Sequence, residues 1–85
     1  SLSDFNEALF AKAKDREAKI KEEAILDKLA SQLVVLKERQ QFNLQIGYGF
    51  NSLAAEIAQE RRIKKGIDER SQKRKQEKLE DEKDR

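Results

Sequence analysis

The spacing of apolar positions along the first part of the chain predicts a long helix. The apolar side chains that recur at helical intervals are Leu2, Phe5, Leu9, Ala13, Ile20 and Ala24. Ser3 is a candidate N-cap residue, and Asp4 and Glu7 place negative charge in the first turn, where the helix dipole favours it. We therefore expect a helix that begins near the first residues and is only thinly apolar over its first 24 positions.

Residues 25–36 form a broader apolar band. At 100° per residue, all its apolar side chains except Val35 lie within an arc of about 180°. They are Ile25, Leu26, Leu29, Ala30, Leu33, Val34 and Leu36, while Val35 lies on the side of Lys28 and Ser31. A helix that packs on one neighbour needs an apolar stripe of only about 100°. One neighbouring helix cannot cover the whole band, so we expect another protein to cover part of it.

Residues 42–50 fit more than one kind of secondary structure. Apolar and aromatic side chains alternate there with polar residues or glycine, at Phe42, Leu44, Ile46, Tyr48 and Phe50. That period of two is typical of a strand, but the spacing from Phe42 through Ile46 to Phe50 also fits a helix. Three outcomes are open: a turn at Gly47–Gly49, an extended segment, or an uninterrupted helix. The turn is favoured because Asn51 and Ser52 follow as N-cap candidates and no second strand is available.

A second helix is predicted after the turn. Its narrow face consists of Leu53, Ile57, Glu60, Ile63 and Ile67, and Gly66 weakens it. Folded back as a hairpin, this arm brings residues 62–73 opposite residues 25–36 and offers only Ile63 and Ile67 there. Residues 68–85 carry fourteen charges and one large apolar side chain, so we expect a charged helix or a disordered tail.

These elements predict an all-α protein. It is an elongated helical hairpin, or two long helices broken near Gly47–Gly49, with residues 1–67 as the hairpin and docking region and residues 68–85 as a charged tail. The composition agrees, because 42% of residues are charged, proline is absent and only three glycines occur. Such a chain has few turns and little material for a globular core.

The residue types exclude several classes of chemistry. The chain contains no histidine and no cysteine, which excludes zinc sites and Ser-His or Cys-His nucleophiles within it. The glycines do not form a phosphate-binding loop. Two acidic clusters, Glu22–Glu23 and Glu80–Asp81–Glu82, are expected on solvated helix faces. We therefore expect no enzymatic activity and no cofactor or metal.

The compartment is constrained only broadly. No apolar run approaches the roughly 20 residues that span a bilayer, and the first residues do not resemble a signal peptide. Methionine is absent, including at position 1, so we expect a processed product or a fragment. The expectation is an intracellular protein of the cytoplasm, the nucleus or an organelle interior, the last after removal of a targeting segment.

The expected function is protein docking. A helical subunit or assembly factor would bind other subunits of a larger complex through an apolar helix face. The residues expected at this contact are Ile25, Leu26, Leu29, Leu33, Leu36, Phe42, Ile46, Tyr48 and Phe50. Aromatic side chains near the turn would serve as anchors, since aromatic residues contribute strongly at interfaces.

A basic segment supports an alternative. Residues 61–78 contain nine basic and three acidic residues, a net charge of +6. The basic residues are Arg61, Arg62, Lys64, Lys65, Arg70, Lys73, Arg74, Lys75 and Lys78. They could neutralise phosphates in an RNA- or ribosome-associated factor, although no aromatic residue is interleaved for base stacking. A homo-oligomeric coiled coil is the other alternative.

Overall fold

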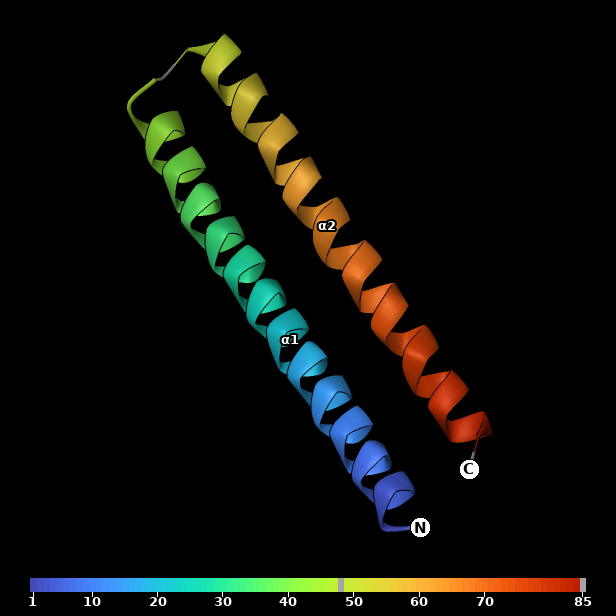
Figure 1. Ribbon diagram of the computed structural model, residues 1–85. Helices are drawn as coiled ribbons and strands as arrows, with labels where there is room; N and C mark the ends of the chain where they lie inside the picture. The colour runs from blue at the N-terminus through green and yellow to red at the C-terminus, as the bar shows by residue number, and fades with distance from the viewer. Residues whose placement is uncertain (48, 85) are drawn as a thin grey trace.

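The chain folds into two long antiparallel helices joined by a tight turn (Figure 1). The computed structural model describes residues 1–47 and 49–84, apart from the side chain of Phe50. Helix α1 spans Leu2–Gln45 and helix α2 spans Phe50–Lys83. The molecule measures 69 × 21 × 15 Å. The predicted all-α, elongated hairpin is confirmed.

The turn lies at the predicted glycines. Helix α1 ends at the C-cap Ile46, and Gly47 follows with φ +73, a left-handed conformation that glycine adopts without a Cβ penalty. Gly49 is the N-cap residue of α2. The prediction that Asn51 and Ser52 cap this helix is wrong, because the chain reverses before them and both already lie in the first turn of α2.

The N-terminus of α1 is capped two residues earlier than predicted. Ser1, not Ser3, is the N-cap: the backbone N–H of Asp4 donates to Ser1 Oγ at 3.3 Å, and the Asp4 side chain completes a capping box. Ser3 lies within the helix. The difference follows from spacing, since Ser1 has an acidic residue three positions later, whereas Ser3 has Asn6 there.

The two helices meet along a seam that repeats every seven residues. The α1 side of the seam, the inner row, consists of Glu22, Leu26, Leu29, Leu33, Leu36, Gln40 and Asn43. The α2 side consists of Leu53, Glu56, Glu60, Ile63, Ile67, Arg70 and Arg74. Intervals of three and four residues alternate in both rows, which keeps each row facing the other helix along its length. The most buried side chains are Leu36, 3% exposed, and Ile63, 9% exposed.

Polar contacts close both ends of the seam. Near the turn, Asn43 Nδ2 donates to Glu56 Oε1 at 2.9 Å, and Lys37 Nζ lies 3.3 Å from Glu60 Oε1. At the open end, Arg70 pairs with Glu22, Arg74 pairs with Glu23, and Lys19 pairs with Asp81. Helix α2 includes residues 68–83 without a break, so the alternative of a disordered tail is wrong for this range.

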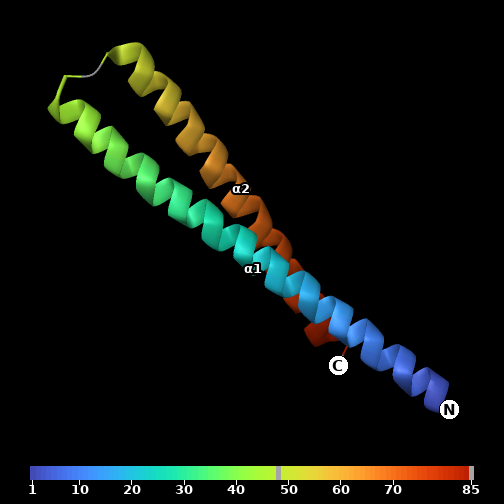
Figure 2. The same ribbon diagram turned by 60° about the vertical axis from the view of Figure 1, so that its left-hand side comes forward.

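Helix α1 is longer than α2 and extends past its end (Figure 2). Lys19 meets Asp81, only two residues before α2 ends at Lys83. The first three turns of α1 therefore have no part of α2 beside them. Their large apolar side chains, Leu2, Phe5, Leu9 and Phe10, are all exposed.

Candidate interaction surfaces

The residues expected to contact a partner divide into two groups in the structure. Leu26, Leu29 and Leu33 are half-buried and Leu36 is buried, because α2 packs against them. Ile25, Phe42 and Ile46 are exposed. Tyr48 and the side chain of Phe50 lie outside the described residues.

Helix α2 covers only one side of the broad apolar band. Helix α2 packs against the four leucines of residues 25–36, whereas Val34 and Val35 stay more than half exposed. The opposing helix supplies Ile63 and Ile67 at this level, as the hairpin register predicts. The apolar surface that stays open is therefore on the flank and the back of α1, and not on the leucine face.

A second row of small and apolar side chains runs along the back of α1. This outer stripe consists of Leu2, Leu9, Ala13, Ile20, Ala24, Ser31, Val35 and Phe42. All eight residues are exposed, and the five large side chains are 50–75% exposed. Ile46, four residues after Phe42, continues the spacing just past the end of the helix.

The outer stripe and the inner row lie on opposite sides of the same helix. At 100° per residue, the mean directions of the two sets differ by about 180°. Intervals of seven and four residues alternate in the stripe, so it repeats every eleven residues. An eleven-residue repeat has 3.67 residues per turn, close to a straight α-helix, and it keeps the stripe nearly in line over the whole of α1.

A shallow groove adjoins the stripe on one flank of the hairpin. It encloses about 430 Å³ and lies between α1 and α2 beside the most buried layer. Val35, Leu36 and Ile63 provide its apolar lining, with Lys28 and Arg39 among the polar residues. Val35 thus belongs both to the stripe and to this groove, so the two surfaces are continuous at the middle of α1.

The predicted basic segment does not form a basic face. At 100° per residue, its nine basic positions point to all sides of α2. Arg70 and Arg74 are half-buried and pair with Glu22 and Glu23 of α1. Lys64 and Lys65 pair with acidic residues of their own helix, Glu60 and Glu69. Much of the local positive charge is therefore neutralised within the hairpin.

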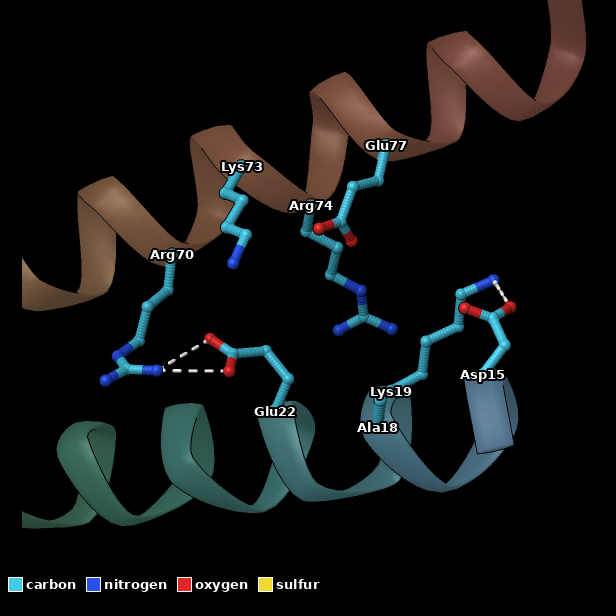
Figure 3. Close-up of a pocket in the computed structure, with 8 residues that line it drawn as sticks. All are labelled: Asp15, Ala18, Lys19, Glu22, Arg70, Lys73, Arg74 and Glu77. Atoms are coloured by element: carbon cyan, nitrogen blue, oxygen red, sulfur yellow. Dashed lines mark hydrogen bonds and ion pairs between the residues drawn. The ribbon is translucent and has the colours of Figure 1, made fainter. Parts of the chain in front are cut away.

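The open end of the seam contains a charged cleft of about 210 Å³ (Figure 3). Arg70 Nη1 donates to both carboxylate oxygens of Glu22, at 2.9 and 3.0 Å, while Lys73 projects beside this pair. Lys19 Nζ lies 3.1 Å from Asp15 Oδ2, and this contact raises the pKa of Lys19 above its ordinary value of 10.5. Within each of these ion pairs the opposite charges neutralise each other.

The polar residues near the turn form a second charged layer inside the seam. The hydrogen bond from Lys37, helped by Lys64, lowers the pKa of Glu60 despite its partial burial. Among the described residues, Gln40 Nε2 and Glu56 Oε2 are buried without a hydrogen-bond partner. Unsatisfied polar atoms weaken this end of the seam.

Sequence reasoning missed the polar members of the seam. Glu22 was expected on a solvated face, and Arg70 and Arg74 were assigned to the basic segment. The available signal was their spacing: Glu22 and Gln40 extend the leucine row, and Glu60 and Arg70 extend the isoleucine row, at intervals of three or four. A search for apolar residues alone cannot find such positions.

Other kinds of site are limited by what the described residues contain. No helix within residues 1–47 and 49–84 is long and apolar enough to cross a membrane. In the same residues, no cluster of three acidic side chains is arranged to hold a metal ion. No protein family, curated protein or solved structure matches the chain.

Proposed function

We propose that this chain is a non-catalytic helical subunit or assembly factor that docks onto a protein partner through the outer stripe of α1. The hairpin acts as an intramolecular antiparallel coiled coil in which α2 supports α1. The single observation that supports this function is the exposure of the stripe. Its five large apolar side chains are at least half exposed on the face away from α2.

The energetic argument rests on the length of the exposed row. Fully burying a leucine, isoleucine or phenylalanine side chain contributes about 1.5–3 kcal/mol. Exposed apolar patches often mark interaction sites, and the row has Leu2 and Leu9 near one end, Val35 and Phe42 near the other, and Ile20 between them. A partner helix laid along α1 would cover the row at the intervals by which helices pack.

The inner leucines have a different role in this proposal. Leu26, Leu29, Leu33 and Leu36 contact α2, so they stabilise the hairpin instead of binding a partner. Of the residues expected at the contact, Phe42 and Ile46 lie along the exposed row. The nucleic-acid alternative gains no support, because the basic residues of 61–78 surround α2 and several are already paired.

Affinity capture from the native cell tests this function. The stripe double variant, Ile20→Asp with Val35→Asp, places two charges in the middle of the exposed row. The matched control, Ala55→Asp with Gln72→Asp, places two charges at exposed positions of α2. We expect the proteins that co-purify with the wild type to be lost with the double variant and retained with the control. Equal recovery with all three chains would contradict docking through the stripe.

A further inference from the structure

We propose that the partner covering the outer stripe is a second copy of this chain, with the two α1 helices antiparallel. This inference rests on the proposed docking function and names the occupant of the same surface. The carrying observation is that the stripe is self-complementary in spacing, in side-chain size and in the charges beside it.

The spacing of the stripe is symmetric about Glu22. Reversing the order of its intervals of seven and four residues gives the same order again. A second copy turned end for end about this midpoint therefore matches every stripe position to a stripe position. Leu2 meets Phe42, Leu9 meets Val35, Ala13 meets Ser31, and Ile20 meets Ala24. A two-fold axis generates each of these layers twice.

Side-chain sizes also match in this register. Near the midpoint, Ile20 of one copy faces the small Ala24 of the other, so the helices can approach closely. On either side, Ala13 faces Ser31, again without a bulky pair. The larger side chains meet towards the ends, where Leu9 lies against Val35. Small residues in the central layers keep the two helix axes close, and larger side chains fill the outer layers.

Charges flank the stripe in a pattern that fits the second copy. At 100° per residue, Arg16 and Asp27 lie on one side of the mean direction of the stripe and Glu17 and Lys28 on the other, with Asp27 and Glu17 at its edges. In the antiparallel register, residues on the same flank meet, so Arg16 faces Asp27 and Glu17 faces Lys28. Symmetry makes four ion pairs of opposite sign around the central layers. Such complementarity favours this pairing over pairing with a surface of arbitrary charge.

In a parallel pair the flank charges would also meet charges of opposite sign, so they do not decide the direction. Two other features favour the antiparallel direction. Antiparallel helices oppose their dipoles. The ends of the stripe also differ in charge, because residues 2–11 carry a side-chain charge of −2 and residues 35–45 carry +1. The antiparallel arrangement sets these ends against each other, whereas the parallel one sets like charges together.

Cysteine cross-linking tests both the occupant and its direction. The natural chain has no cysteine, so each introduced thiol is unique. Ala13→Cys and Ser31→Cys are small changes at exposed stripe positions. In the proposed register, residue 13 of one copy meets residue 31 of the other. Two residues 13 lie 18 positions apart, about 27 Å at 1.5 Å per residue, as do two residues 31.

A mixture of the two cysteine variants should therefore cross-link with a short thiol-reactive reagent, while each variant alone should not. Cross-linking of either variant with itself would show a parallel pair and overturn the proposal. A third outcome is no cross-link at all, together with capture of a different protein that the stripe double variant fails to bind. That outcome would overturn the proposal of a second copy but would still support docking through the stripe. Absence of both cross-links and capture would overturn both.

Charge reversal provides a second readout that does not depend on the reagent. Arg16→Glu and Asp27→Arg each create two like-charged pairs in their own homodimer, and we expect each to self-associate about tenfold more weakly. Mixed together, the two variants restore two opposite pairs and should form a heterodimer of near wild-type affinity. Circular dichroism would verify that both keep the hairpin. Mixing without any recovery of affinity would overturn the antiparallel register.

Discussion

The inner row and the outer stripe of α1 have similar apolar character but opposite environments. The inner row buries Leu36 to 3% exposure against α2, whereas its neighbour in sequence, Val35, is 53% exposed on the outer side. The inner row repeats every seven residues and the outer stripe every eleven. A heptad repeat favours a supercoiled neighbour, while an eleven-residue repeat follows a nearly straight helix. The comparison teaches that one helix carries two partly apolar faces, of which α2 covers only one.

The largest expected difference between the two faces comes from truncating adjacent residues. Leu36→Ala removes a buried side chain and should destabilise the hairpin by about 2–3 kcal/mol or more. Val35→Ala, one residue away on the exposed side, should change stability by less than about 0.5 kcal/mol in dilute solution. Chemical denaturation followed by circular dichroism measures both. Equal losses of stability for the two variants would show that the faces are not distinct.

The turn offers a way to weaken the inner interface without touching either row. Gly47 has φ +73, and Gly47→Ala forces a side chain into this left-handed conformation. We expect a loss of about 1–2 kcal/mol of hairpin stability. Gly49→Ala is the matched control, because Gly49 has φ −62 and the change costs only the N-cap preference of glycine over alanine, without left-handed strain. If Gly47→Ala were as stable as the control, the turn would not require a left-handed residue.

Gly66 allows the inner interface to be strengthened. A Cβ added there would lie 3.8 Å from Leu29 Cδ1, an ordinary van der Waals contact without a clash. Since glycine within a helix costs up to about 1 kcal/mol relative to alanine, Gly66→Ala should raise the stability of the hairpin by roughly 0.5–1 kcal/mol. An increased thermal midpoint would confirm this. A decreased midpoint would mean that the helices leave no room for a Cβ at Gly66.

The smallest expected effect concerns the charged layer near the turn. Lys37 lowers the pKa of Glu60 below its ordinary value of 4.5. A carboxyl group whose pKa is lower in the folded state stabilises the fold above the unfolded pKa, and it loses that contribution as the pH falls through the folded pKa. The wild type should therefore melt above Glu60→Gln at neutral pH, and the difference should shrink below pH 4.5. A difference that does not vary with pH would rule out this contribution.

Much of the fold could be predicted from the pattern of the sequence. The long helices follow from helical spacing and the lack of proline, and the turn follows from Gly47 and Gly49. The two caps were placed wrongly, since Ser1 and Gly49 begin the helices. Cap positions depend on local backbone geometry, and the choice between Ser1 and Ser3 rests on one side chain, Asp4.

The division of the apolar side chains between two faces could not be predicted in the same way. The band at residues 25–36 is about half a turn wide, so its width indicates that one helix cannot cover it, but not which half α2 takes. Polar residues that extend the leucine row mark that half. Glu22 with Arg70 and Asn43 with Glu56 contact each other across the seam at its two ends. A search for apolar residues at regular intervals does not find these polar residues. They are found only when polar positions are included in the seven-residue spacing.

The central claim is that the outer stripe pairs with a second copy of the chain while the inner row folds the hairpin, and sedimentation equilibrium of the stripe double variant beside the wild type tests it most directly. The account predicts that the wild type sediments as a dimer and Ile20→Asp with Val35→Asp as a monomer, with equal helicity of the two chains in dilute solution. A wild type that remains monomeric at all concentrations, or a double variant that still forms the dimer, would contradict it.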